Sequence, residues 1–359
     1  MSDWSYTFDP ISKANWIKKI ESDLLPRSID TIGTEWWPGE LINPLLLADD
    51  CVQSIRLPDS LFAQPPRIIE WIDTSVNEAK DINRRILDAL NYDAESLILH
   101  VDVEKKMPFR LWMDGVISDM IEVSVSVNHE SPEIIHAVRE IIPRNALTRL
   151  NRKNDNQSSS VFLEALQGSM DENAKSYRFV YEIPATGDWT KQTSEIFQLI
   201  IHDLTYWISQ GFNLMDFLEN CILKLTPETH FLKQIIQTRV LHLLWNNLWS
   251  YLTQHENISS SFYLECHILP LSTIDPDKYL IRASASVLAA SLTGAHSICI
   301  HHLSDRNIPE YYKRTDRNIH HLLNLESEMY KGKDPLMGSY SLDYYTHRWT
   351  TDIWSRLHF

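Results

Sequence analysis

Glu265, Cys266 and His267 stand in a row near the end of an apolar run, FYLECHIL (262–269), and are candidates for acid–base chemistry. In an extended strand, alternate side chains face the same side, so Glu265 and His267 share one face and Cys266 takes the other. A carboxylate beside an imidazole can accept or pass on a proton. Two interpretations stay open: a substrate pocket at the carboxyl end of a strand, or a capped strand end without chemistry.

Histidines gather in two segments, HSICIHH (296–302) and NIHHLL (318–323). Neighbouring residues of a helix or a strand point in different directions, so neither adjacent histidine pair is placed to share a ligand. We therefore expect structural histidines and no metal site. His296 falls near a strand end and, like Glu265, is a candidate for substrate contact. The four cysteines are far apart without a CxxC pair, which predicts neither zinc nor disulfides and fits a reducing cytoplasm.

Two arginines are predicted to hold helices in place. Arg282 lies on a predicted helix that follows Asp275, and we expect these two residues to pair. Arg317 is expected to pair with Glu326 or Glu328. Arginine suits such contacts because its guanidinium can bind a carboxylate through two parallel hydrogen bonds. Phosphate binding by either arginine is the alternative.

Composition excludes several classes of function. The formal net charge is −15 and no long basic run occurs, so nucleic-acid binding is not expected. The chain has nine glycines and no GxGxxG, GxxxxGK[ST] or GxSxG motif. No apolar run approaches about 18 residues and the amino terminus does not resemble a signal peptide, so we expect a soluble, cytoplasmic protein with no membrane contact.

Strand-like and helix-like segments alternate from residue 67 onward. Apolar strands that alternate with helices indicate a parallel sheet covered by helices. About eight such units favour an α/β fold of the (β/α)8 TIM-barrel type over an open doubly wound sheet. The polar stretch RKNDNQSSS (152–160) is expected to form a surface loop. Strands are predicted at 67–72, 96–102, 120–127, 177–183, 221–225, 262–269 and 296–302, and helices at 78–90, 132–142, 161–169, 193–209, 227–252 and 276–292.

Residues 1–45 are predicted to form an amino-terminal helical arm, and residues 46–359 the barrel. A short helix rich in aromatic residues needs a surface to pack on. The arm therefore either folds back on its own barrel or docks on another chain. Apolar residues at helical spacing predict one helix that ends near Pro26: Trp16, Ile17, Ile20, Leu24 and Leu25.

Four segments resemble, in the same order, motifs of one known family. RTDRNIHHLLNLES (314–327) is similar to R-x-x-R-N-x-x-x-[LI]-[LI]-x-x-E-[SE], and Asn318 in it is interpreted as structural. DPLMGSYSLDYYT (334–346) is similar to DP-x-G-G-S-Y-x-x-E-x-L-T. DPDKYLIRASASVLAASLTGAHSICI (275–300) and FLKQIIQTRVLHLLW (231–245) resemble two further motifs. The family is that of the methylmalonyl-CoA mutases, which are adenosylcobalamin-dependent acyl-CoA mutases. Weaker matches are WIKKIESDL (16–24), INPLL (42–46) and NRRILDAL (83–90).

The resemblance implies a substrate-binding (β/α)8 barrel that pairs with a sister chain of the same fold. It also implies a separate flavodoxin-like domain for cobalamin, whose D-x-H-x-x-G signature does not occur in this sequence. Adenosylcobalamin is therefore expected on a larger partner chain, and no cofactor is expected on this chain alone. In two-chain members of the family, one chain of the pair is inactive.

Departures from the family pattern concern the active site. The segment in which active barrels carry a histidine for the thioester carbonyl reads YEIPATGDW (181–189) here and contains none. The strand that carries a CoA-binding arginine reads ENCILKL (219–225), with Asn220 near the position of that arginine. The family's Y-x-G-F-S-T substrate loop is absent.

These departures indicate a small-subunit-like, non-catalytic barrel that stabilises a larger, cobalamin-binding mutase chain in a heterodimer. The complex would interconvert methylmalonyl-CoA and succinyl-CoA, and this chain would supply no catalytic residue. One alternative is a split acyl-CoA mutase barrel, with Glu265 and His296 in its pocket, that works with a separate cobalamin chain. Another is an acyl-CoA-binding module, and a homodimer is the alternative assembly.

Overall fold

The computed structural model describes residues 11–33, 35–37, 40–43, 45–50, 54–75, 78–101, 108–127, 138, 141–142, 146–152, 177–184, 187–254, 262–269, 275–301, 310–327 and 332–359. They belong to two compact units, one that extends to residue 50 and one that begins at residue 54. The predicted helix at 161–169, nearly all of the predicted helix at 132–142 and most of the polar stretch 152–160 lie outside the described residues.

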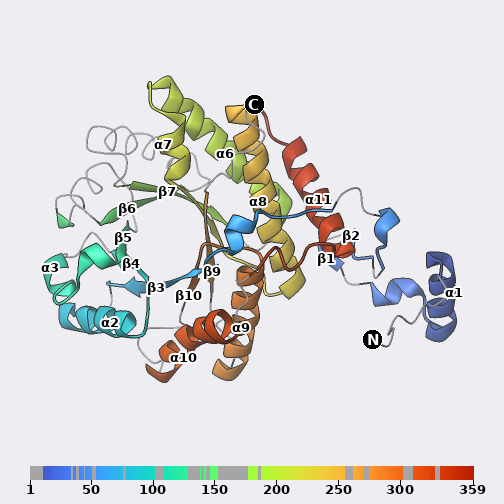
Figure 1. Cartoon of the computed structure of the whole chain (residues 1–359), viewed down its shortest axis with the longest axis horizontal. Coiled ribbons are helices and arrows are strands. Elements are labelled where there is room, and N and C mark those ends of the chain that lie inside the picture. Colours follow the sequence, from blue (N-terminus) through green and yellow to red (C-terminus); the bar gives the residue numbers. More distant parts are fainter. Residues whose placement is uncertain are drawn as a thin grey trace, which may run out of the picture. The chain divides into compact units, whose positions relative to one another are not determined.

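Eight parallel strands close into a barrel in the order β10-β3-β4-β5-β6-β7-β8-β9 (Figure 1). Hydrogen bonds between β10 and β3 complete the ring. The predicted (β/α)8 barrel is therefore confirmed, and the open doubly wound sheet is excluded, because an open sheet would have two unpaired edge strands. The strands are β3 Arg67–Asp73, β4 Ser96–Val101, β5 Glu122–Val127, β6 Leu147–Arg152, β7 Tyr177–Ile183, β8 Cys221–Leu225, β9 Tyr263–Ile268 and β10 Ser297–Ile300.

Helices surround the barrel, as Figure 1 shows. α6 packs on β7, α9 packs on β9 and β10, and α11 packs on both α8 and α6. The helices of this unit are α2 Ala79–Asn91, α3 Phe109–Trp112, α6 Trp189–Ser209, α7 Leu214–Glu219, α8 Phe231–Thr253, α9 Pro276–Leu292, α10 Glu310–His321 and α11 Tyr340–Ser355, with 3-10 turns at Asp59–Phe62 and Ser118–Met120 and a π-helical turn at Leu322–Glu326.

β4 illustrates how one strand supplies two apolar layers. Leu97 and Leu99 face outward and join a buried cluster with Ile86 of α2. Ile98 faces the barrel interior and packs with Cys299 of β10. Because both faces of the strand are covered, its sequence is a nearly continuous apolar run rather than an alternating one.

The ends of α9 follow from its sequence. Asp275 caps the first turn by accepting a hydrogen bond from the backbone N–H of Asp277 at 2.9 Å. Gly294 follows the helix with φ +74°, and a Cβ there would lie 2.8 Å from Leu61 Cβ. Arg282 is half-buried on α9, but it forms no ion pair with Asp275 among the described residues, so the predicted pair is wrong. The Asp275 carboxylate is used in the cap instead.

Arg317 of α10 also has partners other than the predicted ones. Its guanidinium contacts Glu70 of β3 at 2.9 Å and Asp88 of α2 at 3.0 Å. The predicted pairing with Glu326 is therefore wrong, and Glu328 lies outside the described residues. Arg317 does hold elements together, but it joins α10 to β3 and α2, the first strand and helix of the barrel, rather than to its own end.

A second buried ion pair joins α8 to the segment before α11. Arg239 Nη1 lies 2.8 Å from an oxygen of Asp334, and both side chains are fully buried. The same guanidinium donates to the carbonyl of Ile55 at 2.8 Å and lies 3.5 Å from Asp343 of α11. This one arginine thus joins three segments that are far apart in the sequence.

Seven of the eight barrel strands and most of the long helices lie where the sequence pattern predicts them. The strands at 177–183 and 221–225 and the helix at 276–292 have the predicted bounds. β6 and α11 were not predicted. Arg152, the first residue of the predicted surface loop, is in fact the last residue of β6 and forms a buried ion pair with Asp203 of α6 at 2.8 Å.

The amino-terminal unit contains the predicted helix, α1 Lys13–Leu24. Ser12 caps it, and the helix ends directly before Leu25 and Pro26. Lys13 forms an ion pair with Asp50 of the same unit at 2.7 Å. The unit also contains a two-stranded antiparallel pair, β1 Glu35–Trp37 and β2 Glu40–Leu41, and 3-10 turns at Ile29–Ile32 and Ala48–Asp50.

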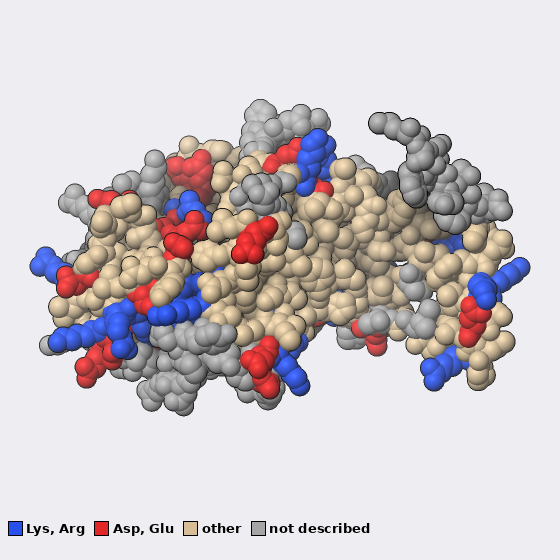
Figure 2. Space-filling model, turned by 60° about the horizontal axis from the view of Figure 1, so that its bottom comes forward, with Lys and Arg blue, Asp and Glu red and all other residues tan. Residues whose placement is uncertain are grey.

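Charged side chains of both signs are interspersed on the surface drawn in Figure 2, with uncharged residues over much of the area between them. The coloured residues of this face form no extended basic patch. Among the helices that the structure describes, none has the length and apolar character needed to cross a bilayer.

Replacing Asp334 by asparagine is expected to lower the free energy of unfolding by about 3 kcal/mol, because the Arg239 charge would lose its closest partner while staying buried. Urea unfolding measures the change. Asp352→Asn is the matched control, since its pair with Arg356 is exposed and the expected change is below about 0.5 kcal/mol. Equal losses in the two variants would contradict this role of the buried pair.

Acid is expected to destabilise the barrel through His242, which is fully buried on α8. Burial, with a contribution from His296, lowers the pKa of His242 to about 3. The unfolded chain takes up this proton near pH 6.5, so stability is complete above that pH and is lost as the pH falls below it. Between pH 7 and 5.5, His242 alone should account for about 1 kcal/mol of lost unfolding free energy.

Urea unfolding at the two pH values tests this expectation. His242→Gln should lose about 1 kcal/mol less than the unsubstituted chain over this interval. His202→Gln is the control, because the ring of His202 is 59% exposed on α6, whereas His242 is fully buried. If both variants keep the full pH dependence, His242 is not the group responsible.

Candidate functional site

Polar and aromatic side chains occupy the barrel interior at the carboxyl ends of the strands. Trp71 of β3 stacks on His100 of β4, with ring centroids 5.0 Å apart. Its ring also contacts His301, which follows β10, and His267 of β9, with centroids 5.2 Å and 6.2 Å away. Lys224 of β8 lies over the same ring, 5.9 Å from its centroid. Since β8 and β9 are not neighbours of β3, these contacts cross the interior, and we call this end of the barrel the mouth.

An ion pair lies inside the barrel below the mouth. Arg149 of β6 and Glu265 of β9 make two hydrogen bonds, one of them 3.0 Å long, although β7 and β8 separate their strands. Both side chains are almost fully buried. Burial by itself would raise the pKa of Glu265, but the Arg149 guanidinium and the hydrogen bond from His267 outweigh it and hold that pKa below its usual value. Glu265 is therefore an anion at neutral pH.

His267 connects this ion pair to the mouth. Its Nε2 lies 3.1 Å from Glu265 Oε2, and its Nδ1 lies 2.8 Å from His301 Nε2. Burial lowers the pKa of His267 to about 4 even though Glu265 opposes the shift, so the ring is neutral at pH 7. A carboxylate can only accept, which places the ring proton on Nε2 and leaves a lone pair on Nδ1. His301 then donates through its own Nε2–H.

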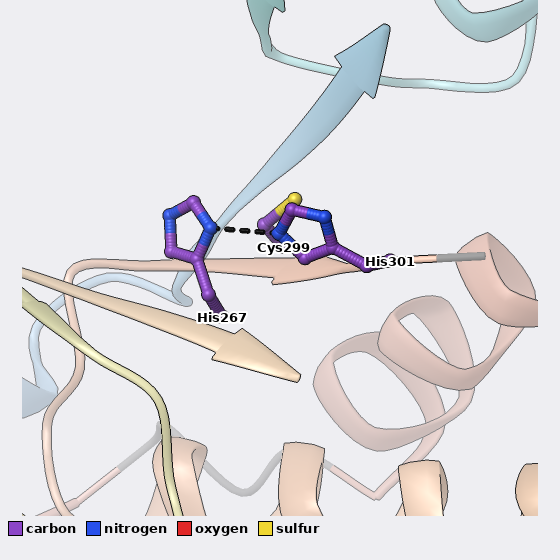
Figure 3. A group of neighbouring side chains, drawn as sticks. All are labelled: His267, Cys299 and His301. Carbon is purple, nitrogen blue, oxygen red and sulfur yellow. Dashed lines mark hydrogen bonds between the residues drawn. The ribbon is translucent and has the colours of Figure 1, made fainter. Parts of the chain in front are cut away.

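Cys299 lies beside the two imidazoles (Figure 3). Its Sγ and one ring nitrogen from each of His267 and His301 lie within 4.8 Å of one another. The thiol is fully buried beside Ile69 and Ile98, and burial raises its pKa well above the ordinary value. The chain Arg149–Glu265–His267–His301, with Cys299 beside it, is suited either to moving a proton towards the mouth or to binding a metal ion.

The two predicted substrate contacts lie in different places. Glu265 points into the barrel, and it shares this face with His267, as the period-two pattern predicts. His296 lies at the amino end of β10, where its Nδ1 accepts from the backbone N–H of Leu264 at 3.2 Å and its ring packs on Phe262 and His242. The structure therefore does not bring Glu265 and His296 into one site, and substrate binding by either residue stays a prediction.

Other predicted positions are also resolved by the structure. Asn318 is exposed on α10, and its structural role stays a prediction. The adjacent His320 and His321 point in different directions, as predicted, because only His320 is fully buried. His301 takes part in the mouth cluster, whereas its neighbour His302 lies outside the described residues.

The sequence analysis missed Arg149, the residue that holds Glu265. Its strand, LTRLNR (147–152), was not predicted because arginines and an asparagine interrupt its apolar residues. The available signal was the period-two spacing of Leu147, Arg149 and Asn151, which places these three residues on one face of a strand. Period two places Arg149 and Asn151 on the interior face, where Asn151 donates to Ser126 of β5 at 3.2 Å.

An open hollow of about 950 Å³ lies at the opposite, amino-terminal end of the barrel. Its wall carries mixed charge, including Arg67 and Glu122, whose charged groups are 3.7 Å apart. Exposed apolar side chains such as Met120 and Leu325 contribute to the same wall. The hollow contains none of the mouth residues, so it is separate from the acid–base cluster.

Comparisons with known proteins were made for both sequence and fold. Residues 200–358 match the model of the family described as methylmalonyl-CoA mutase. No curated protein matches the sequence. Residues 200–358 include α8 to α11, β8 to β10 and both candidate substrate contacts, Glu265 and His296.

Several solved structures are similar to the chain at low identity. The 7,8-dihydropteroate synthase of Vibrio fischeri is 12% identical, with a TM-score of 0.42, and the match covers 74% of this chain and 94% of that one. The dihydropteroate synthase of Stenotrophomonas maltophilia is 10% identical, with a TM-score of 0.46 and coverages of 74% and 94%. The active domain 2 of a Pyrococcus furiosus chitinase is 10% identical, with a TM-score of 0.43 and coverages of 75% and 97%.

Replacing Glu265 by glutamine is expected to lower the free energy of unfolding by about 3–5 kcal/mol, because Arg149 would remain buried without a counter-charge. Glu182→Gln on β7 is the control, since the Glu182 side chain is 51% exposed and its pair with Lys224 contributes little. Chemical unfolding of both variants gives the two differences. A loss below 1 kcal/mol in Glu265→Gln would show that the ion pair does not hold the interior together.

Proposed function

We propose that this chain, which belongs to the methylmalonyl-CoA mutase family through residues 200–358, is a non-catalytic barrel of the small-subunit type. It binds and stabilises a larger chain, which holds adenosylcobalamin and interconverts methylmalonyl-CoA and succinyl-CoA. Binding to the folded partner stabilises that partner by mass action. A location in the cytoplasm is part of the proposal and is supported by three buried free thiols, Cys221, Cys266 and Cys299.

The filled barrel interior is the observation that carries this proposal. Arg149 and Glu265 form an ion pair across it, and Trp71 contacts side chains from several strands at the mouth. An acyl thioester that entered this interior would have to displace a buried ion pair, which is costly because it would strand a charge. The interior of this chain therefore favours a supporting role over a substrate-binding one.

Departures from the family pattern support the same conclusion. Asn220, near the expected position of a CoA-binding arginine, lies at the amino end of β8 and donates to the carbonyl of Asp216 at 2.7 Å. Its side-chain oxygen accepts a hydrogen bond from Arg178, so both polar atoms of the amide form hydrogen bonds within the amino-terminal end of the barrel. The segment 181–189 has no histidine to offer a thioester carbonyl.

Exposed apolar groups support the presence of a partner chain. No residue of α1 is buried, although Trp16 and Ile17 give this helix an apolar face. On the barrel, Ile117, Met120 and Leu325 are 66%, 82% and 65% exposed. Exposed apolar side chains that lie close together are typical of protein interfaces, and Met120 and Leu325 share the wall of one hollow.

His267 of the mouth is not placed to hold cobalamin. The ring of His267 is fully buried, and both of its nitrogens face neighbours, Glu265 and His301. Such a ring cannot reach a cobalt ion outside the barrel. The proposal therefore assigns adenosylcobalamin to the partner chain, and no step of the reaction is assigned to residues of this one.

Affinity purification of the tagged full chain from its source, followed by native mass spectrometry, tests the proposal. We expect recovery of a larger, cobalamin-binding chain in a heterodimer that has mutase activity with adenosylcobalamin. Lys224→Met changes the mouth without altering either residue of the buried ion pair. Lys278→Met, at an exposed position, is the control. The mutase activity per heterodimer should agree within about twofold between the two variants.

Other outcomes would point to the alternatives. Recovery as a homodimer without mutase activity would contradict the partner-subunit proposal, and binding of acyl-CoA to that homodimer would favour a binding module. A loss of more than about tenfold in kcat in the Lys224→Met complex, with the heterodimer intact, would place the chemistry in this barrel instead. That result would favour a split mutase.

A further inference from the structure

Three side chains that can bind a metal ion, His267, Cys299 and His301, meet at the mouth of the barrel (Figure 3). His267 is on β9, and Cys299 and His301 are on β10 or directly after it. Cys299 is paired in register with His267, and period two places His301 on the same face as Cys299. The strand register therefore brings together ligands that are more than 30 positions apart in the sequence.

We propose that this cluster is a binding site for a thiolate-accepting transition-metal ion of the Zn²⁺ class. His267 Nδ1, His301 Nε2 and Cys299 Sγ are its three protein ligands, and the fourth position is left for a water molecule or another small ligand. Histidine nitrogen and cysteine sulfur are the donors that zinc prefers in proteins. Three protein ligands with one open position are also the arrangement of zinc sites that bind a water molecule or another small ligand.

The spacing of the donor atoms is close to what such a site requires. In a tetrahedral site, with Zn–N of about 2.0–2.1 Å and Zn–S of about 2.3 Å, donor atoms lie roughly 3.3–3.7 Å apart. Here the two nitrogens are 2.8 Å apart, and all three donor atoms lie within 4.8 Å of one another. Small side-chain rotations, which separate the nitrogens and bring the sulfur closer, are enough to enclose an ion.

An independent observation is the support behind His267. Its Nε2–H donates to Glu265, which is itself held by Arg149. Histidines that bind metals almost always donate their other ring N–H to a carboxylate or a carbonyl, which fixes the tautomer and directs the free lone pair at the metal. The lone pair on His267 Nδ1 points at His301 and is therefore presented by an arrangement typical of metal sites.

Neighbouring side chains also help to hold the two imidazoles in place. Tyr279 of α9 donates to the backbone carbonyl of His301 at 2.7 Å, which fixes the start of the segment after β10. Trp71 contacts both imidazole rings, with centroids 6.2 Å from His267 and 5.2 Å from His301. A site with fixed ligands and little bulk water loses less entropy when the ion binds.

Metal binding here would exchange protons for the ion. The Cys299 thiol loses its proton to solvent and binds as the thiolate. His301 moves its N–H from Nε2 to Nδ1 and binds as a neutral ring. The hydrogen bond between His301 and His267 is replaced by two metal–nitrogen bonds, while the contact of His267 with Glu265 is kept.

Titration of the metal-free full chain with Co²⁺, followed by visible and near-ultraviolet absorption, tests this site. We expect one Co²⁺ ion to bind per chain. The spectrum should show the d–d bands typical of tetrahedral Co²⁺ and a thiolate-to-cobalt charge-transfer band. Added Zn²⁺ should displace the Co²⁺ and abolish these bands. Cys299→Ser should remove the charge-transfer band. Cys266→Ser is the matched control, because Cys266 is equally buried on the adjacent strand but faces away from the cluster, and it should keep the band.

A second pair of variants keeps the test valid if Cys299→Ser fails to fold. His301→Gln, at a half-buried position, should weaken Zn²⁺ binding by more than the roughly 10–100-fold that loss of a supporting group causes. His100→Gln, a half-buried position at the same mouth, should leave the affinity unchanged. Absence of stoichiometric Co²⁺ binding, or equal effects in His301→Gln and His100→Gln, would overturn the proposal. Neither result depends on mutase activity or on a partner chain.

Discussion

The ion pair between Arg149 and Glu265 determines what the interior of this barrel can contain. A guanidinium and a carboxylate are tolerated in so dry a place only because each satisfies the other. Both carboxylate oxygens of Glu265 accept from Arg149, and Oε2 also takes a hydrogen bond from His267, which in turn faces His301. The polar cluster at the mouth therefore depends on one buried ion pair, because Glu265 positions His267, which in turn contacts His301. Trp71 packs on the imidazoles of His267 and His301 in this cluster.

Buried ion pairs also hold the outer helical layer together. They account for charged residues in the segments that resemble the family motifs. Arg239 and Asp334 come from two different motif segments and meet in a buried ion pair. Arg317, from a third motif, joins α10 to Glu70 and Asp88. These motif residues thus connect helices to strands and to one another, at a distance from the mouth. Their presence here is explained by the fold, because removing one partner of a buried pair is more destabilising than most surface changes.

The match of residues 200–358 to the mutase family and the filled interior at the mouth are compatible. A barrel that supports a catalytic partner needs a stable fold and an exposed apolar surface, and it has no use for an open interior. The proposed partner role requires no substrate path through the interior, where side chains such as Arg149 and Trp71 fill the space. A cluster of His267, Cys299 and His301 fits such an interior, because a bound ion would add stability without requiring room for an acyl thioester.

The sequence by itself determined the alternation of strands and helices, the placement of Glu265 and His267 on one face and the family of the carboxyl-terminal half. These features depend on periodicity and local motifs, which are written into neighbouring residues. It did not reveal β6, since a strand whose interior face is polar looks like a loop. Nor did it give the true partners of Arg317, or the meeting of Arg149 with Glu265 and of His267 with Cys299 and His301. Only closure of the barrel decided those contacts, because strand register and not sequence distance brings these residues together.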